Sequence, residues 1–386
     1  MPREVTRYIS QPVSNMLWGL AAGRCEFAGC NKALWKSSVT QERVNIGQRA
    51  HIWSWSSGGP RGNDGVDAPQ LNSLENLMLV CHDCHKKLDQ RRDGGRYSAE
   101  LLQQWKASHE ARIELVTGVD PSRRSHVLLY GTNVGAHSSP LSFQRAACAL
   151  FPDRYPAEAQ PITLGMINSA WRDRDAEFWG IEEKNLRRQF DEKVRPRLAI
   201  GDIQHISVFG LAPQPLLIVL GSLLTDIVPA DVYQLRREPQ GWKWGNATND
   251  IKFIVNRPTE PNGQPALVLS LSATITADRI RKVLGEEASI WEMTLSLPHN
   301  DWLQSQNQLR AFREALRPLL DQIKAIHGQM TPLHIFPAMP VASAIELGRV
   351  RMPKADTPWC IYDQLNDSGG FIPTLNIGMP QGLSET

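Results

Sequence analysis

The clearest element that the apolar pattern predicts in the first third of the chain is a long helix. Large side chains recur at every fourth position, which places them on one helix face, and Ser98 precedes them as a candidate N-cap. The residues of this face are Leu101, Trp105, His109 and Ile113. A glycine and a proline then stop the helix. We therefore expect a first domain over residues 1–118, a linker over 119–125 and a second domain over 126–386.

The second domain contains a diverged internal repeat. The two copies, at about 205–235 and 332–362, align without a gap through strand, bend and helix at a separation of 127 positions. The paired residues include Phe209 with Phe336, Pro213 with Pro340, and Gly221 with Gly348. Each copy has the pattern of an apolar strand, a proline-containing bend, a helix and a second strand. Such units predict parallel sheets with right-handed crossovers, and we expect two Rossmann-like halves related by a pseudo-twofold axis.

The composition, with 41% hydrophobic and 21% charged residues, is that of a soluble globular protein. The sequence has no uninterrupted apolar run of membrane-spanning length and no apolar segment of a secretory signal at its start. We therefore expect a cytoplasmic protein. The net charge of +2 is unevenly spread, with +4 over residues 1–125 and −2 over the rest. The basic excess suits contact between the first domain and phosphates.

Six cysteines in a chain of this length and compartment argue against a disulfide framework. Four of them form two close pairs, and four thiolates at such spacings suit a tetrahedral structural zinc site. These four are Cys25, Cys30, Cys81 and Cys84. The other two, Cys148 and Cys360, are expected to be small buried apolar residues.

Residues around the second cysteine pair carry the candidate chemistry. His85 and Asp89 are four apart in a predicted helix and project from one face, where imidazole and carboxylate suit Mg²⁺ or Mn²⁺. His51 ends a predicted strand; an imidazole with a reference pKa near ~6.5 is largely neutral at pH 7 and can accept a proton from water. Asn76 cannot titrate, and its amide can fix the imidazole or the loop that presents it.

Residues 24–89 resemble the HNH, or ββα-metal, endonuclease family. The resemblance is carried by Ala50-His51-Ile52, Gly58-Gly59-Pro60-Arg61, Glu75-Asn76 and the segment from Val80 to Asp89. It implies an α+β domain with a zinc knuckle that cuts DNA, in which His51, Asn76 and His85 are catalytic and His85 and Asp89 hold a divalent cation. Many members have a further metal ligand just before the general base, and this chain has Ala50 there.

Several basic residues near this motif are candidate DNA contacts. Arg61 lies in a glycine-rich loop through which the backbone can approach a phosphate; a solvated surface arginine is the alternative. Lys86 and Lys87, with Arg91 and Arg92, form a basic stripe that suits contacts without sequence preference. The alternative for the stripe is an ordinary charged surface.

The second domain resembles the SAVED domain, an α/β fold in which two fused CARF-like halves sense cyclic oligonucleotides. The likeness is carried by the paired bends, above all Phe336-Pro337-Ala338-Met339-Pro340 with Glu346-Leu347-Gly348. Joined to an HNH domain, it resembles the nuclease effectors of CBASS anti-phage systems. The resemblance implies that a cyclic di- or trinucleotide from a partner nucleotidyltransferase, with a dinucleotide such as a cGAMP isomer favoured, drives homo-oligomerisation and degradation of double-stranded DNA.

The bends also have a physical reason to bind such a ligand. A helix N-terminus offers free backbone N–H groups and a positive dipole end to phosphate, and nearby aromatic faces can stack on bases. The candidate ligand contacts are Pro213, Gln214, Pro340, Val341 and Tyr362. Tyr233 is a further candidate for stacking, and a core position is the alternative for Tyr362.

Two other functions fit the sequence. One is a restriction-like HNH nuclease whose second domain recognises modified DNA. The other is a non-enzymatic regulator that binds DNA through a zinc module.

Overall fold

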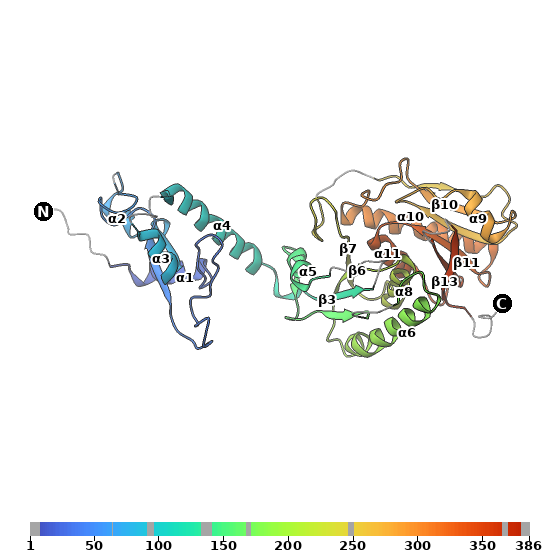
Figure 1. Cartoon of the computed structure of the whole chain (residues 1–386), viewed down its shortest axis with the longest axis horizontal. Helices are drawn as coiled ribbons and strands as arrows, with labels where there is room; N and C mark the ends of the chain where they lie inside the picture. The colour runs from blue at the N-terminus through green and yellow to red at the C-terminus, as the bar shows by residue number, and fades with distance from the viewer. Residues whose placement is uncertain are drawn as a thin grey trace. The chain divides into compact units, whose positions relative to one another are not determined.

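The computed structural model describes residues 8–63, 65–90, 96–132, 141–166, 171–245, 251–364 and 370–379. The chain divides into two compact units, Met1–Asp120 and Pro121–Thr386, which Figure 1 shows in colours running along the chain. The linker expected at 119–125 is shorter in the structure. A 3-10 turn η3 (Pro121–Arg123) and the first residues of β3 (Arg124–Gly131) occupy 121–125.

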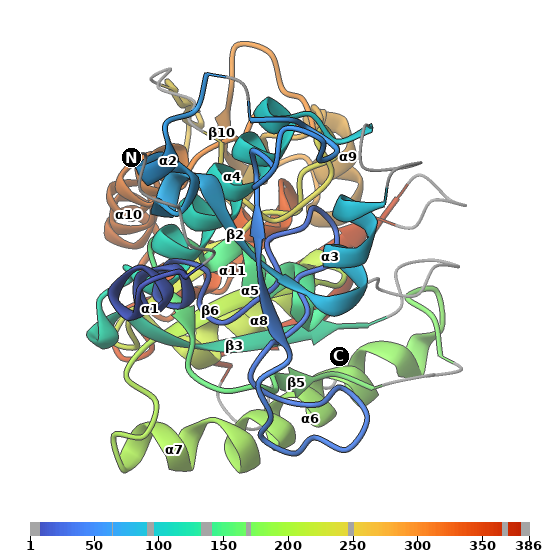
Figure 2. The ribbon, with the colours of Figure 1, turned by 90° about the vertical axis from the view of Figure 1, so that its left-hand side faces the viewer.

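The first unit is built on an antiparallel hairpin of β1 (Gly47–His51) and β2 (Leu77–Cys81), in which His51 lies opposite Leu77 and Gly47 opposite Cys81. Every residue of β2 is buried. Helix α3 (His82–Asp89) follows β2 without a loop, which completes a ββα unit. Figure 2 shows α3 and α1 (Gln11–Leu20) on opposite sides of this hairpin.

The remaining elements of the first unit are short except for its last helix. They are α2 (Ala68–Leu71), the 3-10 turn η1 (Leu74–Asn76) and α4 (Ala99–Thr117). The predicted N-cap of α4 is confirmed, because Ser98 Oγ accepts a hydrogen bond from the Leu101 amide at 3.2 Å. The buried face overlaps the predicted one: His109 is buried and Trp105 packs against the core, but Leu102 and Lys106 are also buried, whereas Leu101 is half-buried.

The described residues of the second unit form two sheets. In the first, all pairings are parallel: β3 pairs with β4 (Tyr155–Pro156), β5 (Ile162–Leu164) and β6 (Ile206–Leu211), and β6 pairs with β7 (Ala230–Tyr233). The second has the order β13-β12-β11-β9-β10-β8, with a parallel centre and antiparallel outer strands. Its strands are β8 (Ile254–Asn256), β9 (Pro265–Ser270), β10 (Ser289–Thr294), β11 (Leu333–Ala338), β12 (Trp359–Gln364) and β13 (Phe371–Ile377).

Helices cover these sheets, and none that the described residues form combines the length and apolar character of a membrane span. They are α5 (Phe143–Leu150), α6 (Ala176–Lys193), α7 (Arg195–Ala199), α8 (Gln214–Leu224), α9 (Ala277–Leu284), α10 (Gln306–His327) and α11 (Val341–Val350). The predicted repeat is confirmed as β6–α8–β7 and β11–α11–β12, each a parallel strand–helix–strand unit. In both copies a phenylalanine stacks on a tyrosine, Phe209 on Tyr233 at 4.5 Å and Phe336 on Tyr362 at 4.4 Å between ring centroids.

The paired glycines of the repeat lie where α8 and α11 cross. A Cβ atom at Gly221 would lie 1.9 Å from the Ile345 carbonyl oxygen, and one at Gly348 would lie 2.0 Å from the Ile218 carbonyl oxygen. Only residues without a side chain let the two helix backbones come this close. The repeat therefore marks the seam that joins the two halves of the second unit.

Candidate active site, metal centre and ligand cavity

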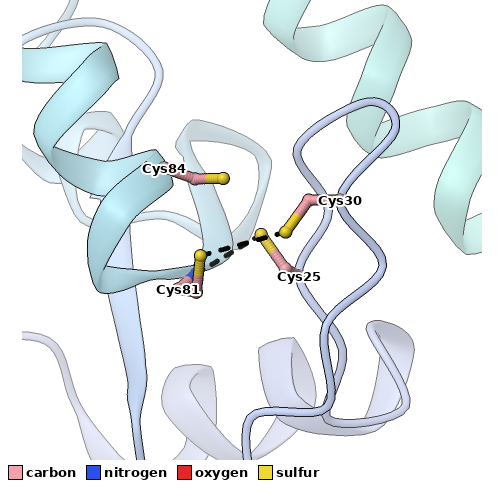
Figure 3. A group of neighbouring side chains, drawn as sticks. All are labelled: Cys25, Cys30, Cys81 and Cys84. Carbon is pink, nitrogen blue, oxygen red and sulfur yellow. Dashed lines mark hydrogen bonds between the residues drawn. The ribbon is translucent and has the colours of Figure 1, made fainter. Parts of the chain in front are cut away.

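The four expected cysteines meet in one cluster (Figure 3). All four Sγ atoms lie within 4.8 Å of one another, and those of Cys30 and Cys81 are 3.9 Å apart. A tetrahedral zinc ion with Zn–S bonds of ~2.3 Å separates its sulfurs by ~3.8 Å, so this donor set fits zinc. Burial raises the pKa of Cys25 to about 12 and also raises that of Cys84. The thiolate form of these two buried groups therefore needs a cation beside it.

The chain shapes this cluster with a turn and a strand end. Gly29 adopts the left-handed conformation (φ 80°) inside the turn between the first two cysteines, and the Cys30 amide donates to the Phe27 carbonyl at 2.9 Å. The second pair stands where β2 passes into α3. Of the two other cysteines, Cys360 is half-buried, but Cys148 is exposed on α5, so the expectation that it is buried is wrong.

His51 ends β1, and its imidazole is oriented by a residue that the sequence motif did not include. His51 Nε2 lies 3.1 Å from Asn72 Oδ1, while Asn72 Nδ2 donates to the Tyr8 carbonyl at 3.2 Å. Because the carbonyl requires an N–H donor, the amide orientation is fixed, and its oxygen must face the ring. Nε2 is then the protonated nitrogen, and in the neutral ring Nδ1 keeps the lone pair.

Asn76 holds the loop rather than the imidazole. Its Oδ1 accepts from the Trp53 amide at 2.7 Å, and its Nδ2 donates to the carbonyls of Trp53 at 3.2 Å and Leu71 at 2.9 Å. Its own carbonyl accepts from the Ile52 amide at 2.8 Å. The buried amide therefore fixes the chain directly after His51, which is the second of the two roles that the sequence left open.

His85 and Asp89 lie together as expected from their spacing, with His85 Nδ1 3.1 Å from Asp89 Oδ2. Two neighbouring ligands of an octahedral cation at ~2.1 Å would be ~3.0 Å apart, so the pair fits Mg²⁺. The hydrogen bond from His85 lowers the pKa of Asp89, against the effect of burial, and the charge of Arg61 lowers it further. Ala50, in the usual position of a further ligand, is buried.

Arg61 has contacts that the sequence did not suggest. Its guanidinium donates to three backbone carbonyls, those of His51 at 3.0 Å, Leu88 at 2.9 Å, and Ile52. These bonds tie the end of β1 to the end of α3, and burial lowers the pKa of the guanidinium. The expected contact between Arg61 and a phosphate stays a prediction. The structure adds a second role, in which the guanidinium holds the end of β1 against the end of α3.

The other candidate DNA contacts are partly described. Lys86 and Lys87 are exposed on α3, and Lys87 Nζ lies 5.9 Å from the Phe27 ring centroid. Arg91 and Arg92 lie outside the described residues.

Two adjoining cavities of about 390 and 370 Å³ open in the second unit, where strands of both halves end. Gln234, Leu235, Arg236, Arg237, Asn300 and Asp301 line both. The second is also lined by Leu211 at the end of β6, by Ser272 after β9, and by Pro340 and Val341 after β11. Of the five candidate ligand contacts, Pro340 and Val341 line this cavity. Arg236 and Arg237 were not among the predicted ligand contacts, although residues that follow a strand of an open sheet commonly line its ligand crevice.

The other three candidates lie elsewhere. Tyr362 is 5% exposed, stacks on Phe336 and bonds through its hydroxyl to His334 Nδ1 at 3.0 Å, so the expectation that it stacks on a ligand is wrong. Pro213 is the buried N-cap of α8. Gln214 Oε1 instead accepts from the Met339 amide at 3.2 Å.

The N–H groups at the second bend are not all free, contrary to expectation. Besides the bond from Met339 to Gln214, the Ala342 amide at the start of α11 donates to Gln234 Oε1 at 3.1 Å. Side chains of one half therefore cap the helix N-terminus of the other, and a ligand there would meet fewer free amides than the sequence suggested.

Comparison with known proteins assigns both units. Residues 25–92 match the family model described as HNH endonuclease, and residues 186–377 match the SMODS-associated and fused to various effectors sensor domain, SAVED. A search of curated proteins found no match.

Solved structures that resemble the chain include a Cap4 SAVED/CARF-domain containing receptor from Acinetobacter baumannii with the cyclic trinucleotide 2′3′3′-cAAA. Its TM-score is 0.42 at 15% identity, with 71% of this chain and 55% of that chain covered. The same receptor without a named ligand gives 0.40 at 15% identity, covering 80% and 63%. The Cap4 receptor from Moraxella osloensis gives 0.38 at 13% identity, covering 73% and 60%. The chain therefore spans less than two thirds of these receptors.

The two family matches, with the cysteine cluster and the paired strand–helix–strand halves, identify an HNH endonuclease domain at residues 25–92 and a SAVED sensor domain at residues 186–377.

Proposed function

We propose that this chain is a metal-dependent DNA endonuclease that a cyclic oligonucleotide switches on in bacterial anti-phage defence of the CBASS type. The observation that carries the proposal is that Arg61 joins the carbonyl of His51 to that of Leu88, beside the His85–Asp89 pair, in a unit that a cysteine cluster holds together. These groups supply a base and a cation site within one small ββα unit. In the second unit, a cavity with paired arginines supplies a place for an anionic ligand.

The residues of the first unit divide the work of phosphodiester hydrolysis. His51 takes a proton from water through Nδ1, because Asn72 holds the hydrogen on Nε2. Arg61 and Asn76 fix the backbone at His51 and directly after it. Zn²⁺ on the four cysteines would hold the turn with Cys25 and Cys30 against the junction of β2 and α3 and would stabilise the fold. Mg²⁺ or Mn²⁺ on His85 and Asp89 would stabilise the negative charge that develops on the phosphate and the leaving oxygen.

The ligand cavity favours a molecule with more than one phosphate. Arg236 and Arg237 both line it, and among the described residues the buried Nε of Arg236 has no hydrogen-bond partner. Two neighbouring guanidiniums match the two phosphates of a cyclic dinucleotide, so a cGAMP isomer is the first candidate. The Acinetobacter baumannii Cap4 receptor was solved with a cyclic trinucleotide, and a trinucleotide is therefore the second.

The ligand acts by stabilising an active assembly. A nuclease of low sequence preference must be held inactive until infection, and a ligand that binds an oligomeric state more tightly than the free chain shifts the population towards it. A partner nucleotidyltransferase in the bacterial cytoplasm would make this ligand. The substrate is double-stranded DNA.

The decisive experiment incubates the purified chain with plasmid, Mg²⁺ or Mn²⁺, and a panel of cyclic di- and trinucleotides. We expect cleavage with one ligand and little without it, and we expect His51→Ala to abolish cleavage while DNA binding remains. His82→Ala is the matched control, because this exposed histidine of α3 bonds to Gln48 and not to the residues around Asp89. Equal cleavage with and without every ligand would disprove the gate. No cleavage under any condition would disprove the nuclease and favour a DNA-binding regulator.

A further inference from the structure

The first unit has a cavity of about 670 Å³ whose lining does not include His51, His85 or Asp89. We name it the α1–β1 groove, because it lies between helix α1 and the start of β1. Its lining residues are Gln11, Ser14, Asn15, Trp18, Trp35, Arg43, Val44, Asn45, Gly47 and Arg49. The mechanism above uses none of them.

Two tryptophans give the groove its apolar surface. The indole of Trp18 lies against the backbone of β1, since a Cβ atom at Gly47 would be 2.7 Å from Trp18 Cζ2. Gly47 thus allows the ring to lie directly on the strand. Trp35 stands at the rim and is 47% exposed, with Lys36 Nζ 5.2 Å from its ring centroid. An indole of this exposure, beside an ammonium, offers an open aromatic face to another molecule.

Three contacts show that the groove leads towards the catalytic imidazole. Trp18 lies on Gly47, Ser14 Oγ accepts from Arg49 Nη1 at 3.3 Å, and the carbonyl of Tyr8, just before α1, binds the Asn72 amide that holds His51. Helix α1 therefore runs antiparallel to β1.

The catalytic histidine also shares a strand face with the groove. Gly47, Arg49 and His51 occupy alternate positions of β1 and so lie on one face of the strand. From Gly47 to His51 the strand rises by about 13 Å. This length corresponds to about four base pairs of B-DNA.

The chemistry of the lining suits a nucleic acid strand. Arg43 and Arg49 supply two cations, and no acidic residue is among the described residues that line the groove. Asparagine and glutamine side chains add donors and acceptors. A cationic groove with aromatic faces binds the backbone through charge and a base through stacking, with little sequence preference.

We propose that the α1–β1 groove is a second DNA-binding site, in which Arg43 and Arg49 hold phosphates and Trp35 packs against a nucleotide beyond the Gly47 end of β1, which lies about 13 Å from His51 along the strand. It rests on the proposed function and adds a named binding surface to it. The groove aligns the DNA strand so that the scissile phosphate reaches the His51 imidazole. This alignment needs no contact that distinguishes one base from another.

The test measures DNA affinity of the full chain in a His51→Ala background, with a labelled 20-base-pair duplex and the corresponding single strand at several salt concentrations. Trp35→Ala should weaken binding roughly 5- to 100-fold, and Trp35→Phe should restore most of it. Arg43→Ala should lower the salt slope by about one. In the chain with His51 intact, Trp35→Ala should raise KM and leave kcat within about threefold, because the contact lies outside the reacting centre.

Two matched controls lie in the second unit. Trp171 is 40% exposed, and the Arg188 side chain is 73% exposed; alanine at either should change neither affinity nor slope. Zinc content and circular dichroism report whether each variant folds, and Arg43→Ala at the exposed rim decides the matter if Trp35→Ala does not fold.

The outcomes separate this proposal from the function on which it rests. If the folded variants keep the affinity, KM and salt slope of the parent, and the parent binds DNA, the proposal that the groove binds DNA is wrong while the proposed function stands. A change in oligomeric mass without a change in DNA affinity would also overturn it, because the groove would then hold protein. Failure of the parent chain to bind any DNA would overturn both.

Discussion

Replacement of Arg61 by lysine separates the two roles that sequence and structure give this residue. Lysine keeps the positive charge that a phosphate contact needs. It cannot reproduce the planar fork that reaches the carbonyls of His51, Ile52 and Leu88 together. If Arg61 mainly holds β1 against α3, Arg61→Lys should behave like Arg61→Ala. If it mainly binds phosphate, the lysine variant should behave like the parent.

The magnitude follows from the bonds. A lysine that keeps one of the three loses two, and with about 1.5 kcal/mol for each hydrogen bond from a charged donor, the first unit should lose about 3 kcal/mol of unfolding free energy. Displacement of the His51 backbone should lower kcat by about 10- to 100-fold, because small misplacements of a reacting group have effects of this size. DNA affinity should change by less than about threefold, the loss that a missing phosphate contact would exceed.

The assay compares kcat, DNA affinity and urea unfolding for the parent, Arg61→Lys and Arg61→Ala, with the activating ligand present for kcat. Arg112→Lys is the control, since this arginine of α4 donates to Asn31 and lies outside the site. Parental kcat and stability in Arg61→Lys, together with much weaker DNA binding in Arg61→Ala, would refute the holding role and establish the phosphate contact.

Four further predictions follow from other sites. Cys30→Ser should reduce bound zinc and destabilise the first unit, measured by metal analysis and melting, whereas the exposed Cys148→Ser should change neither; full zinc in the former would contradict the cluster. Arg237→Ala should weaken cyclic oligonucleotide binding at least about tenfold in calorimetry, and unchanged affinity would exclude this cavity. Burial raises the pKa of Glu182 to about 7, above its ordinary value, so its stabilising effect is present at low pH and is lost as pH rises from about 4.5 to 7. Glu182→Gln should therefore raise the unfolding free energy by about 3 kcal/mol at pH 8 and hardly at pH 4.5, in urea titrations; equal effects at both would contradict the shift. Gly348→Ala should destabilise the second unit by at least about 3 kcal/mol in the same assay, since its Cβ would lie 2.0 Å from a carbonyl oxygen; a neutral effect would contradict the helix crossing.

The nuclease unit was predictable because its chemistry is local in sequence. The second cysteine pair, His85 and Asp89 lie within one strand end and one helix, so spacing alone places them. The sequence does not predict contacts between residues of separate loops. Asn72 meets His51 only through the fold, and the Arg61 guanidinium turns inwards to backbone carbonyls that no residue pattern reveals.

The helix before the second unit shows a smaller limit of the same kind. The periodicity and the cap predicted α4 correctly, and the predicted His109 is buried. However, Leu102 and Lys106 are buried as well, whereas Leu101 is only half-buried. Lys106 is buried because it pairs with Glu110 one turn later, a compensation that a count of apolar residues does not register. The hydrophobic pattern predicts the helix, and the ion pair with Glu110 allows the charged side chain of Lys106 to lie on its buried face.

The sensor unit shows why a repeated residue was a poor guide to the ligand. The features shared by the two halves, the stacked Phe–Tyr pairs and the glycines of the α8–α11 crossing, are buried in the scaffold that the halves have in common. Tyr362 was chosen from this shared set and lies in the core.

At the second bend, the copies share Pro340, which corresponds to Pro213, and differ at the next position, although both residues of the second copy line the cavity. Gln214 in the first half corresponds to Val341 in the second, 127 positions later. Gln214 reaches across to the Met339 amide, whereas Val341 lines the cavity. A duplicated fold that binds one ligand at its seam keeps its scaffold residues in both copies, and the two sides of the shared site are free to diverge. Mutagenesis of the sensor should therefore begin with Arg236 and Arg237, which follow β7 and line both cavities.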